Sequence, residues 1–358
     1  MSFTIDNHVL KKYSGKDKNV TIPDGITEIG DEAFSRNTSG FKTVVIPSSV
    51  TKIDWRAFSN TKITKMSLPN GITEIGNNAF QGCHNLKQII LPDSLEELGF
   101  GAFEECESLT KINLPKGLTA IHSDTFLACF GLEKVSLPEG ITEIDYKAFY
   151  RCKSLREIIL PNTLEKLGTL AFGLCENARK LHLPESLRVI GEFSFWCCKG
   201  LDRVEIPEGV TTIEPAAFCS CTGLKSVTLP STITCIKDRA FCGCERLKSI
   251  EFPEGLNKID SELMSGCTSL ESVTIPESVR SIELWAFVDC PNLKEITIPY
   301  NVTKIGECAL GYYIDTHGNR GLPGMPYPID GGFTIKGYAY TEAERYANDN
   351  GFRFVELN

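Results

Sequence analysis

Cysteine is the residue type in this sequence whose number and spacing could do chemistry. There are 15 cysteines among 358 residues, and a thiolate can act as a nucleophile, form a disulfide or bind zinc. Ten of them recur at intervals of 23 residues: Cys83, Cys106, Cys129, Cys152, Cys175, Cys198, Cys221, Cys244, Cys267 and Cys290. Equivalent residues of a stacked repeat lie about 4.8 Å apart with parallel side chains, whereas a disulfide needs Cβ atoms about 3.8 Å apart and turned toward each other. We therefore expect a column of buried free thiols, which favours a reducing compartment or an anaerobic habitat.

The cysteines outside this column include two that form CxC pairs. Cys219-Ser220-Cys221 and Cys242-Gly243-Cys244 fall on adjacent repeats and could offer four sulfurs to a zinc ion. The four sulfurs cannot converge if Cys221 and Cys244 face the core. The sequence therefore predicts no metal site and no cofactor. The other three cysteines outside the column are Cys197, Cys235 and Cys308.

Histidine, the commonest acid–base residue, is scattered along the chain. No histidine recurs beside a serine, cysteine or carboxylate in a way that the geometry of stacked repeats would bring together, and neither a phosphate-binding glycine loop nor an HExxH motif is present. His182 lies at an outward strand position, where it is either a solvated surface residue or a ligand or pH-sensing group. The sequence thus predicts a protein that is not an enzyme. The five histidines are His8, His84, His122, His182 and His317.

The cysteine column belongs to a repeat that the prolines also mark. Thirteen of the 18 prolines, from Pro23 to Pro299, are spaced 24, 22 and then 23 residues apart, and phenylalanine keeps the same register from Phe34 to Phe241. A fixed period of about 20 to 29 residues with leucine-like positions is typical of a leucine-rich-repeat solenoid. The predicted fold is a right-handed superhelix with a parallel sheet on one face. Short strands, turns and helical turns form the other face, with a cap at each end.

Each repeat reads as a strand, a turn and a second inward segment. Leu86, Ile89 and Leu91 alternate with outward positions, as in a strand with one buried face. Proline ends the strand because it lacks a backbone donor. After the turn, Leu95 and Leu98 point inward again, and an Ala-Phe pair follows on a short helical turn. Phenylalanines of neighbouring repeats should stack, so the core exists only between repeats.

The recurring pattern "LPxxLTxIGxxAFxxCxxLxxIxL" resembles the BspA-like leucine-rich repeats of bacteria. The first residues, "FTIDNHVLKKYSGKDKNVTIP", resemble that family's N-terminal cap, and "FTIKGYAYTEAERYANDNGFRFVELN" resembles its C-terminal strand-helix-strand cap, with Thr341 as candidate N-cap and Gly351 as stop signal. The resemblance implies a binding module, often on a cell surface and sometimes an adhesin, without catalysis. The chain departs from better-known leucine-rich repeats because no asparagine ladder follows the strand. We predict a cap over 1–22, the solenoid over 23–310, a Gly/Pro/Tyr-rich loop over 311–332 and a second cap over 333–358.

The strand face is the surface that a partner could use, because its side chains repeat at a fixed spacing. The two positions before the second inward strand residue carry 13 basic and five acidic residues over the repeats, in a chain of net charge −9, whereas the residue after each proline is mostly acidic. These two stripes either keep the edge soluble or form a docking face for a protein or anionic glycan. Ile90 and Ile159 are apolar where the strand should face water, which indicates either a hot spot or strand propensity alone. The candidate binding face comprises Lys87, Ile90, Lys111, Lys134, Arg156, Ile159, Arg179, Lys180, His182, Arg203, Lys225 and Lys248.

The loop before the C-terminal cap is a second candidate contact site. Tyr312, Tyr313 and Tyr327 lie in a segment without periodicity, where they could contact a partner or brace the cap.

Net charge and the distribution of apolar residues restrict the classes of partner and the compartment in which the chain could work. The acidic net charge argues against nucleic acid, and no apolar run approaches the roughly 18 residues of a membrane span. The N-terminus lacks the apolar stretch of a secretory signal, which favours the cytoplasm by default, whereas the family resemblance favours a surface or secreted protein. We predict a monomeric interaction module for a protein or glycan. The alternative is a structural spacer or cytoplasmic scaffold.

Overall fold

The structure is a computed structural model that describes residues 2–35, 37, 40–315, 324–329 and 332–358. The chain divides into two compact units, Met1–Lys180 and Leu181–Asn358. We call them the N-terminal unit and the C-terminal unit. The boundary falls inside the repeat array.

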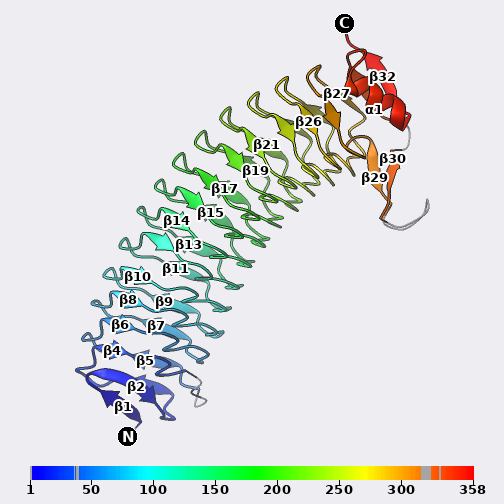
Figure 1. Ribbon diagram of the computed structural model, residues 1–358. Helices are drawn as coiled ribbons and strands as arrows, with labels where there is room; N and C mark the ends of the chain where they lie inside the picture. The colour runs from blue at the N-terminus through cyan, green and yellow to red at the C-terminus, as the bar shows by residue number, and fades with distance from the viewer. Residues whose placement is uncertain (1, 36, 38–39, 316–323, 330–331) are drawn as a thin grey trace. The chain divides into compact units, whose positions relative to one another are not determined.

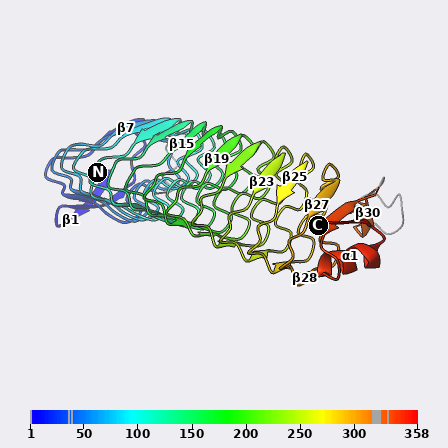
Figure 2. The same cartoon turned by 90° about the horizontal axis from the view of Figure 1, so that it is seen from above.

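The N-terminal unit is a stack of rungs with two rows of short parallel strands (Figure 1). It begins with the antiparallel hairpin of β1 (Phe3–Asp6) and β2 (Val9–Tyr13), and β2 pairs in parallel with β4 of the second row. The first row consists of three-residue strands: β3 (Asn19–Thr21), β5 (Thr43–Val45), β7 (Lys65–Ser67), β9 (Gln88–Ile90), β11 (Lys111–Asn113), β13 (Lys134–Ser136) and β15 (Glu157–Ile159). The second row consists of two-residue strands: β4 (Glu28–Ile29), β6 (Lys52–Ile53), β8 (Glu74–Ile75), β10 (Glu97–Leu98), β12 (Ala120–Ile121), β14 (Glu143–Ile144) and β16 (Lys166–Leu167). Seen from above, the first row follows one side of this unit (Figure 2).

Strand pairing keeps the register of the sequence repeat. In β11 and β13, Ile112 pairs with Val135 between the outward pairs Lys111–Lys134 and Asn113–Ser136. The predicted parallel sheet is therefore confirmed. The second row of strands was not predicted. The segment after the turn, which the sequence showed only as inward-pointing residues such as Leu98, also pairs between rungs, Glu97 with Glu74 and Leu98 with Ile75.

The C-terminal unit has the same two rows, and β17 (Lys180–His182) spans the boundary in the sequence. The three-residue strands are β19 (Arg203–Glu205), β21 (Ser226–Thr228), β23 (Ser249–Glu251), β25 (Ser272–Thr274) and β27 (Glu295–Thr297). The two-residue strands are β18 (Val189–Ile190), β20 (Thr212–Ile213), β22 (Cys235–Ile236), β24 (Lys258–Ile259), β26 (Ser281–Ile282) and β28 (Lys304–Ile305). Together the rows confirm the solenoid fold in both units.

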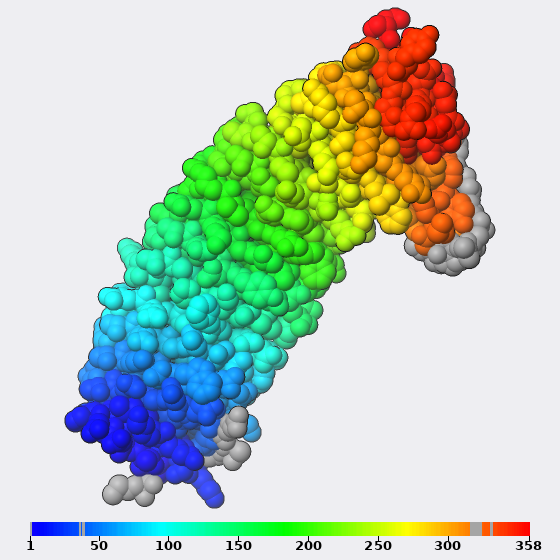
Figure 3. Space-filling view, viewed as in Figure 1, coloured from blue at the N-terminus to red at the C-terminus, as the bar shows by residue number. Residues whose placement is uncertain are grey.

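Phenylalanines form the centre of the core. In the N-terminal unit the rings of Phe34, Phe58, Phe80, Phe103, Phe126, Phe149 and Phe172 stack in sequence, with centroids 4.8 to 5.6 Å apart and planes within 12° of parallel. In the C-terminal unit, Phe195, Phe218 and Phe241 continue the pattern at 5.2 and 5.7 Å. The predicted stacking is confirmed. On the face that Figure 3 shows, side chains close the gaps between the rungs of each unit.

The column cysteines are buried free thiols, as predicted. The thiols along the column donate to the carbonyl of the core residue in the preceding rung, for example Cys83 Sγ to Phe58 O, Cys152 Sγ to Phe126 O and Cys221 Sγ to Phe195 O, each at 3.2 Å. Thr61 stands at this position in an earlier rung, and its hydroxyl contacts Cys83 Sγ at 3.3 Å. The column therefore favours a small side chain that fills apolar space and also donates.

The predicted helical turn is a pair of tight turns, each with a residue in the left-handed conformation. In one rung these are Lys147 (φ 55°) and Arg151 (φ 65°). Their backbone N–H groups point to the next rung and bond to Thr169 O at 3.0 Å and Gly173 O at 2.8 Å. The inter-rung bonds require this geometry, so a helix cannot propagate through the turn.

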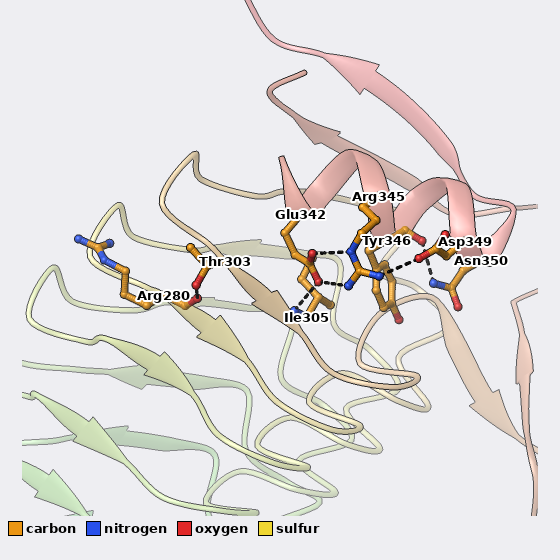
Figure 4. Close-up of polar contacts among 8 residues, drawn as sticks. All are labelled: Arg280, Thr303, Ile305, Glu342, Arg345, Tyr346, Asp349 and Asn350. Atoms are coloured by element: carbon orange, nitrogen blue, oxygen red, sulfur yellow. Dashed lines mark hydrogen bonds and ion pairs between the residues drawn. The ribbon is translucent and has the colours of Figure 1, made fainter. Parts of the chain in front are cut away.

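The C-terminal cap closes the last rung. It consists of β31 (Thr334–Gly337), α1 (Glu342–Asn350) and β32 (Arg353–Glu356), and β31 pairs in parallel with both β27 and β32. Figure 4 shows α1 over the end of the rungs, where the Glu342 carboxylate accepts from Ile305 N at 3.1 Å. These contacts satisfy backbone groups that a further repeat would otherwise pair.

The boundaries of α1 agree with its predicted signals, with one correction. Gly351 ends the helix in the left-handed conformation, at φ 68°. Thr341 occupies the N-cap, but its hydroxyl donates to Tyr338 O instead of capping the helix. The Glu344 carboxylate accepts from Tyr340 N at 2.7 Å at this end of the helix.

Candidate binding surface on the strand side

The three-residue strands of the first row turn their first and last residues outward and the middle one inward, where it is buried or half-buried. This alternation follows from the pleat of a strand with one buried face. In β15, Ile158 is buried between the exposed Glu157 and Ile159. All predicted strand-face residues of the N-terminal unit are exposed: Lys87, Ile90, Lys111, Lys134, Arg156, Ile159, Arg179 and Lys180.

The exposed isoleucines each line a shallow hollow. Ile90, which is 54% exposed, lies in a hollow of about 390 Å³ between β9 and β11 that also contains Leu91, Leu114 and Pro115. Ile159, which is 59% exposed, lies in a hollow of about 290 Å³.

The hollow at Ile159 has an apolar floor and a charged rim. Val135 and Ile159 supply the apolar side chains, and the rim consists of Glu133, Lys134, Arg156 and Glu157. Glu133 and Arg156 also line a neighbouring hollow of about 380 Å³ with Ser154, Asn177 and Arg179. The two hollows thus share one ion pair, in which Arg156 Nη2 lies 3.5 Å from Glu133 Oε2.

Several strand-face cations, among them Arg156, Lys180, Lys225 and Lys248, pair with carboxylates of neighbouring rungs. Lys180 Nζ lies 2.9 Å from Glu157 Oε1, and its hydrogen bond lowers the pKa of the Glu157 carboxyl. In the described part of the chain no ion pair joins a strand-face cation to the acidic column that follows the prolines. Exposed pairs of this kind contribute about 0 to 1 kcal/mol each, so a partner can rearrange them at little cost.

On the strand face of the C-terminal unit, ion pairs form both between rungs and within one strand. His182, Arg203, Lys225 and Lys248 are exposed. Lys225 Nζ lies 3.6 Å from Asp202 Oδ2, Lys248 Nζ lies 3.1 Å from Glu271 Oε1, and Arg203 Nη1 lies 3.7 Å from Glu205 Oε1. The predicted residues therefore divide between two units, eight in the first and four in the second.

The predicted tyrosine site is built on an antiparallel hairpin of β29 (Tyr312–Ile314) and β30 (Pro326–Pro328). Tyr312 Oη donates to Asn350 Oδ1 at 2.7 Å, and its ring packs edge-on against Phe352. Tyr313 and Tyr327 pair across the hairpin with ring centroids 6.3 Å apart. All three tyrosines are half-buried. Tyr312 braces α1, because its hydroxyl bonds to Asn350 at the end of that helix. Residues 316–323 and 330–331 of the predicted loop, including His317, lie outside the described residues.

The family profile described as "BspA type leucine rich repeat region (6 copies)" matches residues 4–132, 119–230 and 211–314. The chain belongs to this BspA-type leucine-rich-repeat family. The predicted resemblance is confirmed. No protein of curated function matches the chain.

Solved structures of bacterial leucine-rich-repeat proteins share this BspA-type fold. A leucine-rich repeat protein from Bacteroides ovatus is 29% identical with a TM-score of 0.70, over 79% of each chain. A leucine rich cell surface protein from Faecalibacterium prausnitzii is 26% identical with a TM-score of 0.55, over 89% of this chain and 93% of that one. A leucine-rich repeat protein from Eubacterium ventriosum is 21% identical with a TM-score of 0.53, over 85% of this chain and 90% of that one, and shows the fold alone.

Among the described residues, no three of the His, Cys, Asp and Glu side chains gather closely enough to hold a metal ion. None of the described helices has the length and apolar character needed to cross a membrane. Cys221 and Cys244 face the core, so the four sulfurs of the CxC pairs do not converge.

Two features of the surface were missed in the sequence. The first is the ion pairing between rungs, which a comparison of charges 23 residues apart reveals, as at Glu133 and Arg156 or Asp202 and Lys225. The second is the hollows, which depend on side-chain shape and have no sequence signal. Column totals of charge do not show either feature.

Proposed function

We propose that this chain is a non-catalytic protein-interaction module that docks its partner on the strand side of the N-terminal unit, in the hollow at Ile159. The observation that carries the proposal is an apolar side chain, 59% exposed, at the centre of a charged rim. Protein interfaces have this anatomy, since a central anchor is desolvated while a polar rim excludes water.

The rim favours a protein over an anionic glycan. Lys134 and Arg156 would attract an anion, but Glu133 and Glu157 line the same hollow. A uniformly anionic ligand would meet these carboxylates, and like charges across an interface cost affinity. A protein surface can place both signs of charge opposite the rim. The experiment below also tests for a glycan partner, by competition with an acidic polysaccharide.

The experiment compares two substitutions of exposed residues in the same strand position. Ile159→Asp places a charge in the hollow, whereas Val45→Asp makes the same kind of change in β5, where Val45 is also 59% exposed. Each folded protein is used to capture partners from bacterial lysate and from host-tissue extract, in parallel with the wild type. We expect Ile159→Asp to lose the partner at least tenfold and Val45→Asp to retain it.

The outcomes separate the proposed functions. Equal retention of the partner by both variants contradicts docking at Ile159. A partner that acidic polysaccharide competes away indicates a glycan. Capture of nothing by the wild type favours a structural spacer. The rung-to-rung ion pairs also suit that function, because they compensate part of the strand-face charge without a partner.

The cell surface is the compartment that we propose, with an adhesin-like role. The support is the similarity to the Faecalibacterium protein, which is described as a cell surface protein. Protease treatment of intact cells that produce the chain should remove it while a cytoplasmic marker survives. Protection of the chain together with the marker would favour a cytoplasmic scaffold.

A further inference from the structure

Cys219 and Cys242 occupy the same position in successive rungs of the C-terminal unit. The backbone bond from Ser220 N to Cys242 O, 2.6 Å long, holds the two turns side by side. Each cysteine precedes a residue in the left-handed conformation, Ser220 at φ 59° and Gly243 at φ 69°, so both side chains leave equivalent corners of the turn. The rung spacing of about 4.8 Å falls within the Cα separation of about 4.4 to 6.8 Å that a disulfide spans. Unlike the packed column thiols, these two half-exposed side chains have room to turn toward each other.

This pair differs from the column cysteines in exposure and in contacts. The thiols of Cys221 and Cys244 are fully buried and donate to Phe195 O and Phe218 O. Cys219 and Cys242 are half-exposed instead, and neither thiol bonds to a core carbonyl in the described part of the chain. The two CxC motifs therefore divide by position, the second cysteine of each serving the core and the first facing outward.

The surroundings of the pair favour a thiolate on Cys219. The hydrogen bond from the Cys242 thiol lowers the pKa of Cys219 to about 7 against the opposing effect of burial, with smaller contributions from the Ser220 hydroxyl and the Arg239 guanidinium. Ser220 Oγ lies 3.6 Å from Cys219 Sγ. Arg239 is anchored by two bonds to Glu262, from Nε at 2.9 Å and from Nη2 at 2.6 Å. A partly exposed thiolate beside a second thiol is the arrangement that thiol–disulfide exchange requires.

We propose that Cys219 and Cys242 form a thiol–disulfide exchange site for low-molecular-weight disulfides, with Cys219 as the attacking residue and Cys242 as the resolving residue. The Cys219 thiolate attacks one sulfur of the disulfide RSSR, whose S–S bond breaks and releases RS⁻. Cys242 then loses its proton to solvent and attacks Cys219 Sγ. This second step releases the other RS⁻ and leaves a Cys219–Cys242 disulfide. Two cysteine thiols are oxidised, and RSSR is reduced to two thiols.

The test uses the full chain and oxidised glutathione at neutral pH. Intact mass and peptide mapping of the wild type should show loss of two hydrogens and a Cys219–Cys242 linkage, without a lasting glutathione adduct. Cys242→Ser should accumulate one glutathione on Cys219, because the resolving thiol is absent. Cys219→Ser should lose at least nine-tenths of the initial rate. Cys235→Ser is the matched control, since Cys235 is also half-exposed, and it should leave the rate unchanged.

Several results would overturn the site. A disulfide mapped to Cys197 or Cys235 in the wild type contradicts the pairing, and this measurement needs no variant. Absence of any adduct on Cys242→Ser contradicts attack by Cys219. Equal initial rates of reaction with oxidised glutathione for the wild type and Cys219→Ser contradict Cys219 as the attacking residue.

Discussion

At the residue scale, the repeated phenylalanine stabilises two neighbouring rungs at once. Phe149 is fully buried and stacks on Phe126 at 5.1 Å and on Phe172 at 5.0 Å. A cavity at this position cannot be filled from within one rung. The free energy of the stack is therefore shared between repeats.

Phe149→Ala should lower the free energy of unfolding by about 3 to 5 kcal/mol, because it removes a buried ring and leaves a cavity between two rungs. Urea denaturation measures this change. Tyr146→Ala is a control in the same rung, since Tyr146 is 43% exposed, and it should cost less than about 1 kcal/mol. A Phe149→Ala protein that unfolds like the wild type would contradict the stacked core.

At the element scale, the turns use left-handed residues so that each rung can bond to the next. Glu105 has φ 57°, and its N–H donates to Leu127 O at 2.7 Å. Gly266 has φ 74°, and its N–H donates to Val288 O at 2.9 Å. The backbone bond is the same whether or not the residue has a Cβ, but the Cβ adds strain of about 1 to 2 kcal/mol.

Glu105→Gly should therefore raise the free energy of unfolding by roughly 0.5 kcal/mol, since relief of strain exceeds the entropy that glycine adds to the unfolded chain. Gly266→Ala should lower it by about 1 kcal/mol. A Cβ at Gly266 meets its nearest atoms at 3.5 Å, which is ordinary contact, so the loss reports backbone strain alone. Urea midpoints check both variants. A Gly266→Ala protein more stable than the wild type would contradict the left-handed backbone strain at this position.

The element scale also shows what the sequence could predict. Phenylalanine, cysteine and proline columns are nearly uniform in residue type, so their stacking and burial follow from spacing. The left-handed column reads Glu32, Arg56, Asn78, Leu170, Phe193 and Trp285 among others, with little glycine. The left-handed conformation is imposed by backbone bonds to the next rung. The residue types in this column do not predict it.

The candidate surface was predictable only in part. Exposure of Ile90 and Ile159 follows from strand alternation. The hollows depend on side-chain packing across two rungs. The outward placement of Cys219 and Cys242 on neighbouring turns depends on which cysteine of each CxC motif leaves the core. The division at Lys180 has no Pro/Gly cluster or break in period to mark it.

At the scale of the whole molecule, many buried thiols make stability sensitive to alkali. Burial raises the pKa of Cys83 from 9.0 to about 11 and those of Cys129 and Cys267 from 9.0 to about 12. Below pH 9 the thiols are protonated in both the folded and the unfolded chain. Between pH 9 and 11 the unfolded chain loses these protons while the folded chain keeps them, so the free energy of unfolding falls as pH rises.

Each such thiol should contribute about 1.4 kcal/mol per pH unit, and these three together roughly 4 kcal/mol per unit. Urea denaturation between pH 8 and 10.5 in reductant measures the slope. Cys129→Ala should reduce it by one thiol's share, since a methyl group does not titrate. A free energy of unfolding that stays constant from pH 9 to 10.5 would show that the buried thiols do not control alkaline stability.

Docking of a partner in the hollow at Ile159 can be tested without changing the charge of that hollow. The most direct measurement is photo-crosslinking in the extract that contains the partner, with a photoreactive residue at position 159 or, as control, at the exposed position 166 in the second row of strands. We expect a crosslinked partner from position 159 and none from position 166. A partner crosslinked only from position 166, or equally from both, would contradict docking in the hollow.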